Sequence, residues 1–206
     1  GFFVWDDLRH NKLNIHHYRL QTKLVLSGTG LLILLPAAFF FFYEFQQPGW
    51  SGMSIGERLL ASLFQSVTPR TAGFNTVDLT QLQSPGILLI ISLMVIGGSP
   101  GSTAGGIKTT TFAMLILCVG STFRKKDCIQ CFSRRIPPEA LRNAVTILML
   151  YLTLFLCGGN LISCVEGLPL SAALFEAASA IGTVGLSLGI TGELGVVSRI
   201  TLITLM

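Results

Sequence analysis

Long uncharged apolar runs restrict what this chain can fold into more than any other feature of its sequence. Residues 24–43 form a run of 20 residues without a charge, residues 143–165 a run of 23, and residues 79–107 a run of 29. At about 1.5 Å per helical residue, 20 residues cross a hydrocarbon core of about 30 Å. These runs lack the polar face that a helix of a soluble bundle shows at helical period. With only 12% charged residues, the chain is predicted to be an all-α integral membrane protein.

Basic residues are concentrated in two segments that flank the apolar runs. Ten of the 14 Lys and Arg residues lie within residues 9–23 and 124–142. Because Lys and Arg accumulate in cytoplasmic segments of membrane proteins, both segments are predicted to face the cytoplasm of a multi-pass protein of the plasma (inner) membrane. No aromatic residues interleave with a basic face, so we predict membrane lipid as a partner and no nucleic acid.

The two halves of the chain repeat one order of elements. Residues 61–64 (Ala-Ser-Leu-Phe) match residues 172–175 (Ala-Ala-Leu-Phe), and each match lies in a predicted short helix, at 55–67 and at 170–181. Neither helix is long enough to cross a membrane. Each is followed by a predicted extended return. We predict four segments: a cytoplasmic lead-in at 1–22, a helix–pore-loop–helix unit at 23–123, a basic cytoplasmic linker at 124–138, and a second, truncated unit at 139–206.

Each predicted return contains a short Thr-x-Gly motif. The second reads Thr-Val-Gly, as does the start of the potassium-channel filter. Such a segment can turn its backbone carbonyls toward an ion and replace the water around it. Potassium is therefore predicted to bind only at carbonyls of the first three residues of each motif. The alternative is that the two glycines serve helix packing. The predicted filter comprises Thr71, Ala72, Gly73, Phe74 and Asn75 in the first half, and Thr183, Val184, Gly185 and Leu186 in the second.

A glycine-rich segment at 97–107 interrupts the third apolar run. Glycine and proline both weaken a helix, and five glycines surround Pro100 here. The next residue, Lys108, costs about 2.5–3.5 kcal/mol at membrane depth, so we expect it to face the pore or to pair with carbonyls or a carboxylate of a neighbouring repeat. The alternative is snorkelling to the cytoplasmic interface. The predicted gate residues are Gly97, Gly98, Gly101, Gly105, Gly106 and Lys108.

Other chemistries are disfavoured by the residues present. A phosphate-binding loop needs a glycine directly before its lysine, and Ile107 stands there. The isolated CxxC at 128–131 has no second pair or nearby His, as a metal or redox site would need. The pore regions contain no His, no Cys and no Ser/His/Asp set, so we predict neither an enzyme nor a cofactor. Arg70, just before the first motif, is expected to form a bracing salt bridge with Asp78 or Glu57.

Three stretches, at 67–76, 96–111 and 175–187, closely resemble the Trk/Ktr/HKT superfamily of potassium transporters, and within it the Ktr-type membrane subunit. The resemblance implies four helix–pore-loop–helix repeats around one pore, of which this chain supplies the third and fourth. It implies that the 97–107 loop is an intramembrane gate below the filter. It also implies a homodimer and a cytosolic nucleotide-binding regulatory subunit, for which the basic linker is a candidate docking surface.

Potassium uptake, passive or sodium-coupled, is the function that these features favour. One alternative is a sodium-selective or unselective transporter of the same superfamily, because the first two pore loops are absent from this sequence. Another is a non-conducting membrane assembly subunit, although a glycine at both filter positions argues against it. The chain starts without Met and stops inside an apolar run, so we expect it to be part of a longer polypeptide.

Overall fold

The computed structural model describes residues 2–11, 18–101, 104–123, 130–131, 134–135 and 137–206. Within these residues the chain is α-helical, apart from one antiparallel ladder between the two-residue strands β1 (Gln130–Cys131) and β2 (Arg134–Arg135). The predicted all-α class is confirmed. The helices are α1 (Phe2–Asn11), α2 (Leu20–Phe42), α3 (Ile55–Val67), α4 (Ser84–Val95), α5 (Thr109–Phe123), α6 (Pro138–Glu166), α7 (Leu170–Ile181) and α8 (Val196–Leu205).

Two helical segments of the described chain are long and apolar enough to cross a membrane, Gln21–Gln46 and Glu139–Glu166. They overlap α2 and α6 almost completely and cover the apolar runs at 24–43 and 143–165. The third apolar run forms no continuous helix, because α4 ends at Val95 and α5 begins only at Thr109. The glycine-rich segment predicted at 97–107 lies in the gap between these two helices.

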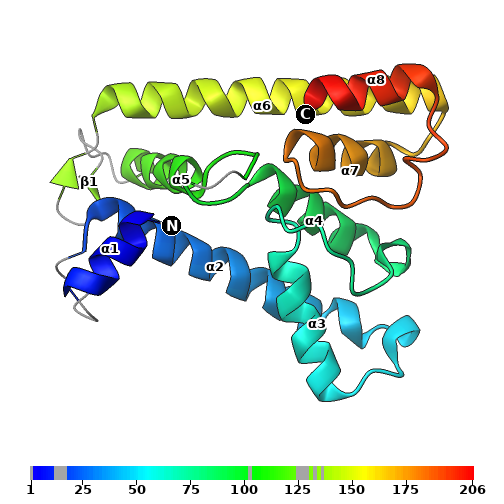
Figure 1. Cartoon of the computed structure of the whole chain (residues 1–206), viewed down its shortest axis with the longest axis horizontal. Coiled ribbons are helices and arrows are strands. Elements are labelled where there is room, and N and C mark those ends of the chain that lie inside the picture. The colour runs from blue at the N-terminus through cyan, green and yellow to red at the C-terminus, as the bar shows by residue number, and fades with distance from the viewer. Residues whose placement is uncertain (1, 12–17, 102–103, 124–129, 132–133, 136) are drawn as a thin grey trace.

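The two halves meet through α4 and α7. Figure 1 shows α6 and α8 along the top of the view and α2 below, with α4, α5 and α7 between them. Helix α3 packs against α2, and α7 packs against α6, α8 and α4. The core at this junction contains Phe40 of α2, Ile90 and Met94 of α4, and Phe175 of α7, all completely buried. This core fixes the ends of α3 and α7, from which the two return segments start.

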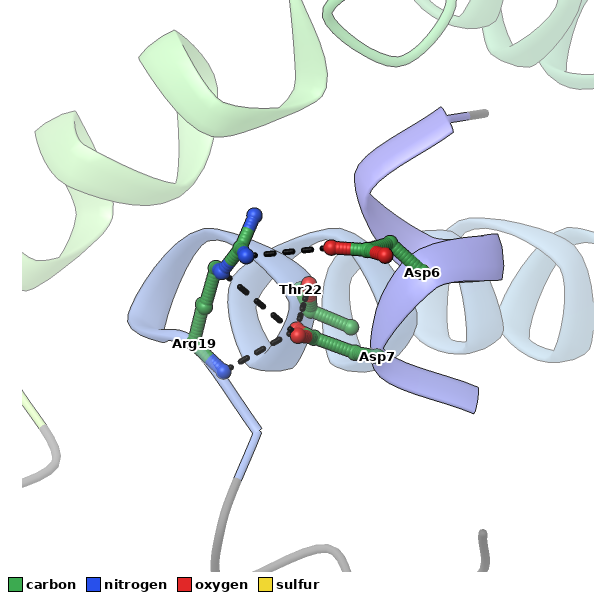
Figure 2. A network of polar contacts seen from close by, with 4 residues as sticks. All are labelled: Asp6, Asp7, Arg19 and Thr22. Carbon is green, nitrogen blue, oxygen red and sulfur yellow. Dashed lines mark hydrogen bonds and ion pairs between the residues drawn. The ribbon is translucent and has the colours of Figure 1, made fainter. Parts of the chain in front are cut away.

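Two helices begin against a carboxylate that another helix supplies. Asp7 of α1 accepts hydrogen bonds from the backbone N–H of Arg19, the residue that precedes α2, at 3.1 Å, and from the Thr22 hydroxyl at 2.6 Å (Figure 2). Glu166 of α6 accepts in the same way from the N–H of Gly195, which precedes α8, at 2.8 Å and from the Ser198 hydroxyl at 2.5 Å. The first N–H groups of a helix lack internal partners and attract negative charge, so both contacts stabilise a helix start.

The start of α4 has the same arrangement with one contact missing. Glu44, which follows α2, accepts from the N–H of Gln83, the residue that precedes α4, at 2.7 Å. In α2 and α8 the hydroxyl that contacts the carboxylate lies three residues after the bonded N–H, at Thr22 and at Ser198. The corresponding residue of α4 is Gly86, which has no hydroxyl. A methyl group added at Gly86 would lie 2.7 Å from Glu44 Oε2. Glu44 is completely buried, and its Oε2 has no hydrogen-bond partner within the described residues.

We predict that Thr22→Val loosens α1 from the start of α2. The variant keeps the shape of Thr22 but removes the hydroxyl that reaches the buried Asp7, and a hydrogen bond to a charged group contributes about 1.5–3 kcal/mol. Hydrogen exchange of the α1 amides should therefore rise about 10- to 100-fold. Arg19 also pairs with Asp6 at 3.0 Å, and this contact remains (Figure 2).

The control for this experiment is Ser27→Ala, because the exposed Ser27 hydroxyl bonds only carbonyls of its own helix, those of Lys23 and Leu24. Unchanged exchange in α1 of the Thr22→Val protein would show that the Asp7 contact does not hold α1.

Parts of the predicted lead-in and linker lie outside the described residues, namely 1, 12–17, 124–129, 132–133 and 136, and Cys128 is among them. The lead-in contains the helix α1, which was not predicted. The division of the chain into two repeat units stays a prediction.

Candidate functional site

The two predicted return segments lie against each other. A methyl group added at Gly73 would lie 2.1 Å from the carbonyl oxygen of Val184 and 3.6 Å from the Cα atom of Gly185. The backbones of the two segments are therefore in direct contact, although more than 100 residues separate them in the sequence. Helix α3 leads into the first segment and helix α7 into the second.

Both segments have a left-handed backbone at the same two positions of the motif. The φ angle is 70° at Thr71 and 74° at Gly73, and 50° at Thr183 and 89° at Gly185. A left-handed conformation costs a residue with a side chain roughly 1–2 kcal/mol, so the two threonines are held in place by their surroundings. The two halves thus build the same turn, and strained backbone of this kind is found at functional sites.

A cavity of about 300 Å³ adjoins the second segment. Thr183 and Gly185 are exposed, whereas Val184 and Leu186 are buried. In the first segment Gly73 is half-buried, and Phe74, 70% exposed, and Asn75 point outward. The cavity is lined by Glu176, Thr183, Gly185, Ser187 and Thr191, among others.

The glycine-rich segment between α4 and α5 closes on itself. The Ile107 N–H donates to the Val95 carbonyl at 2.9 Å, and the Thr109 N–H to the Gly98 carbonyl at 3.2 Å. Methyl groups would meet backbone at 1.9 Å if added at Gly97 and at 2.8 Å if added at Gly106. Gly97 and Gly106 leave no room for a side chain because of these backbone contacts. Gly98 and Gly105, two further predicted gate residues, take part in the same contacts. Gly101 has a φ of 80° and open space around it, and residues 102–103 lie outside the described residues.

The glycine-rich segment touches the second return segment directly. The Gly105 N–H donates to the Thr183 hydroxyl at 3.1 Å. A methyl group at Gly105 would lie 2.5 Å from that hydroxyl oxygen and 2.6 Å from the Gly182 carbonyl oxygen. The structure therefore brings the predicted gate and the predicted filter together at Gly105 and Thr183.

Lys108 is held inside its own loop. Its ammonium group donates to the carbonyl of Ala104, four residues earlier. A pairing with a carbonyl is thus present, and this carbonyl belongs to the segment that ends at Lys108. This bond ties the end of the loop to the start of α5.

The predicted salt bridge of Arg70 is wrong. The Glu57 carboxylate instead accepts from the N–H of Ser54 at 2.7 Å, which forms a capping box at the start of α3. Asp78 accepts from the hydroxyl and the N–H of Thr80, at 2.7 Å and 3.0 Å. These bonds lower the pKa of both carboxyl groups below the usual value. Nε of Arg70 is buried without a hydrogen-bond partner among the described residues.

Glu176 and Gln65 were missed by the sequence analysis, although both lie in the short helices that lead to the filter. Glu176 of α7 is 3% exposed and accepts three hydrogen bonds from residues that follow the second motif. Gln65 of α3 is completely buried. The signal for Glu176 was available: it is the only ionisable residue of α7, and a carboxylate in an apolar segment at membrane depth marks a functional site.

Comparison with known proteins shows the family to which the chain is similar. The sequence profile of the TrkH family, described as a cation transport protein, matches residues 20–206. The chain is 36% identical to the potassium/sodium uptake protein NtpJ of Enterococcus hirae, over all of this chain and 46% of that protein. It is 35% identical to the Ktr system potassium uptake protein B of Vibrio alginolyticus, and 36% identical to the protein of that name from Bacillus subtilis. Each of these alignments also covers 100% of this chain and 46% of the relative, so the chain spans about half the length of these relatives.

Proposed function

Because this chain belongs to the TrkH family of cation transport proteins, we propose that it supplies half of a pore for potassium uptake across the plasma membrane. The chain is an all-α membrane protein, and its relatives are cation transporters and not enzymes. One observation carries the proposal: two Thr-x-Gly turns from different halves of the chain share one pattern of left-handed backbone and lie in contact. Two such turns are two walls of a carbonyl-lined filter.

Ion passage in this proposal follows from the chemistry of the two segments. Backbone oxygens of residues 71–73 and 183–185 replace part of the hydration shell of potassium, a large and weakly hydrated cation. The glycine-rich loop at 97–107 lies at Thr183 and acts as the gate, and Lys108 holds its end through Ala104. The remaining walls of the pore come from the part of the protein outside this chain.

The assembly in this proposal is multi-pass and has partners. Two relatives are named as components of a Ktr system, which supports a complex with further subunits. We propose a homodimer in the lipid bilayer, with a cytosolic nucleotide-binding regulatory subunit that docks on the basic linker at 124–138. The only ligand that we propose for the pore is the transported potassium ion.

A transporter that takes both potassium and sodium is the second candidate. The observation that favours it is the name of the Enterococcus hirae relative, a potassium/sodium uptake protein. Sodium-coupled potassium uptake would also involve both ions, so the test must measure the two separately.

The test is potassium and sodium uptake by the complete protein in cells that lack their own potassium uptake systems. Growth rescue and uptake with potassium alone would support a potassium-selective pore. Potassium uptake that requires sodium would support coupling, and equal uptake of both ions would support the second candidate. Absence of uptake of either ion, with the protein present in the membrane, would overturn the proposal in favour of a non-conducting subunit.

A further inference from the structure

Glu176 forms a closed ring of contacts with two hydroxyl groups behind the second filter segment. Its Oε1 accepts from the Ser187 hydroxyl at 2.7 Å and from the Leu188 N–H at 3.0 Å, and its Oε2 accepts from the Thr191 hydroxyl at 2.7 Å. The hydroxyl oxygens of Ser187 and Thr191 lie 2.7 Å from each other, which closes the ring of contacts; because both hydroxyl hydrogens are donated to Glu176, this third contact carries no hydrogen of its own. The Gly189 N–H also donates to Ser187 Oγ at 2.9 Å. The ring thus joins helix α7 to the backbone that directly follows the filter motif.

The first half of the chain has no such ring. When the two motifs are aligned, Asn75 stands at the place of Ser187 and Leu79 at the place of Thr191, so neither hydroxyl is present. When the short helices are aligned instead (61–64 with 172–175, one residue closer to the motif in the first half), Gln65 stands at the place of Glu176. Gln65 is completely buried, and its two amide atoms have no hydrogen-bond partner among the described residues. In this half, the Thr68 hydroxyl instead holds the Phe74 carbonyl at 2.6 Å.

We propose that Glu176 is a positioning residue of the filter, and that its ring of hydrogen bonds sets the potassium-over-sodium selectivity of the second segment. The inference rests on the proposed function and deepens it. Selectivity depends on where the carbonyls around the ion are held. Ser187 directly follows Leu186, so fixing its side chain fixes the backbone at the end of the motif. Linked hydrogen bonds in a buried site strengthen one another and rigidify what they join.

The effect of the hydrogen bonds and the effect of the ionisable group can be separated with the variant Glu176→Gln. A glutamine oxygen accepts from Ser187 and Leu188 as Oε1 does, and its amide group donates to Thr191, whose hydroxyl then donates to Ser187. Every contact of the ring remains, and only the ionisable group is lost. The variant Glu176→Ala removes the ring and leaves the Leu188 N–H without its acceptor.

The experiment compares potassium and sodium uptake by the complete protein carrying Glu176→Gln, Glu176→Ala or the control Gln65→Met. We expect Glu176→Gln and Gln65→Met to stay within about twofold of the wild-type selectivity ratio. We expect Glu176→Ala to lower that ratio about tenfold, because all three hydrogen bonds that hold the backbone after the motif are lost. Within the described part of the chain, the Gln65 amide has no hydrogen bond to lose, and Met has a similar volume.

Thr191→Val serves if the alanine variant does not fold, since it keeps the shape of Thr191 and removes one member of the ring. We expect its selectivity ratio to fall in the same direction. An equal loss in Glu176→Gln and Glu176→Ala would overturn the proposal, because charge and not bracing would then matter. Wild-type selectivity in both Glu176→Ala and Thr191→Val would also overturn it. Wild-type protein without potassium uptake would overturn the proposed function together with this inference.

Discussion

Gly73→Ala should lower the potassium-over-sodium selectivity of the complete protein about tenfold or more and reduce the yield of folded protein. The new methyl group would lie 2.1 Å from the Val184 carbonyl oxygen, a backbone atom that cannot move aside without moving the second filter segment. Overpacking of a close-packed site costs about 1–3 kcal/mol, and each 1.4 kcal/mol is a factor of about ten. The φ of 74° adds roughly 1–2 kcal/mol for alanine.

Gly185→Ala provides the matched comparison for this prediction. Gly185 also has a left-handed backbone, with a φ of 89°, but within this chain a methyl group there would meet nothing within 4 Å. Gly185→Ala therefore places alanine in a left-handed conformation but creates no steric clash. We expect it to lower selectivity and folded yield less than Gly73→Ala does. Uptake of the two ions and the amount of protein in the folded fraction are measured for both variants. Equal effects would mean that the contact between the two segments does not matter for selectivity.

Gly105→Ala should raise the potassium flux through the complete protein about tenfold if the glycine-rich loop is the gate that we propose. The methyl group would lie 2.5 Å from the Thr183 hydroxyl oxygen and 2.6 Å from the Gly182 carbonyl oxygen, so the glycine-rich loop must move away from the filter. The displacement also breaks the hydrogen bond from Gly105 to Thr183. A gate destabilised in its closed position by about 1.4 kcal/mol is open about ten times more often.

Uptake rates in vesicles that contain the purified complete protein measure this effect. Gly120→Ala is the control, because Gly120 lies in the middle of α5 with nothing within 4 Å of an added methyl group. A lower flux in Gly105→Ala, with the fold intact, would show that the loop does not close the pore.

Much of the helical layout could be predicted because its signals are local in the sequence. The short helices predicted at 55–67 and 170–181 form with those bounds. Ser54 and Glu57 mark the start of the first, as a capping box does, and a glycine directly follows the second. Periodicity and composition also gave the two long apolar helices. The missed helix α1 has little apolar pattern and depends on its contact with Arg19 and Thr22 for its position.

The contacts that build the candidate site could not be predicted, because they join distant residues. Nothing in the sequence pairs Gly105 with Thr183 or Gly73 with Val184. The wrong prediction for Arg70 has a different cause. Asp78 and Glu57 are close to it in sequence, but each has donors closer still, in its own turn or helix start. A carboxylate satisfied by neighbouring N–H and hydroxyl groups gains little from a distant guanidinium.

The missing hydroxyl at Gly86 makes α4 the easiest of the three carboxylate-bound helices to tilt. The starts of α2 and α8 each have two bonds to a carboxylate, whereas the start of α4 has one, from Gln83 to Glu44, and α4 is otherwise held by the packing of its buried side chains in the core. With 12 residues, α4 is a rod about 18 Å long, so a swivel of about 10° displaces its far end by about 3 Å. The glycine-rich loop is attached at that far end. A small rotation at the start of α4 would thus displace the loop that we propose as the gate by a distance comparable to the diameter of a potassium ion.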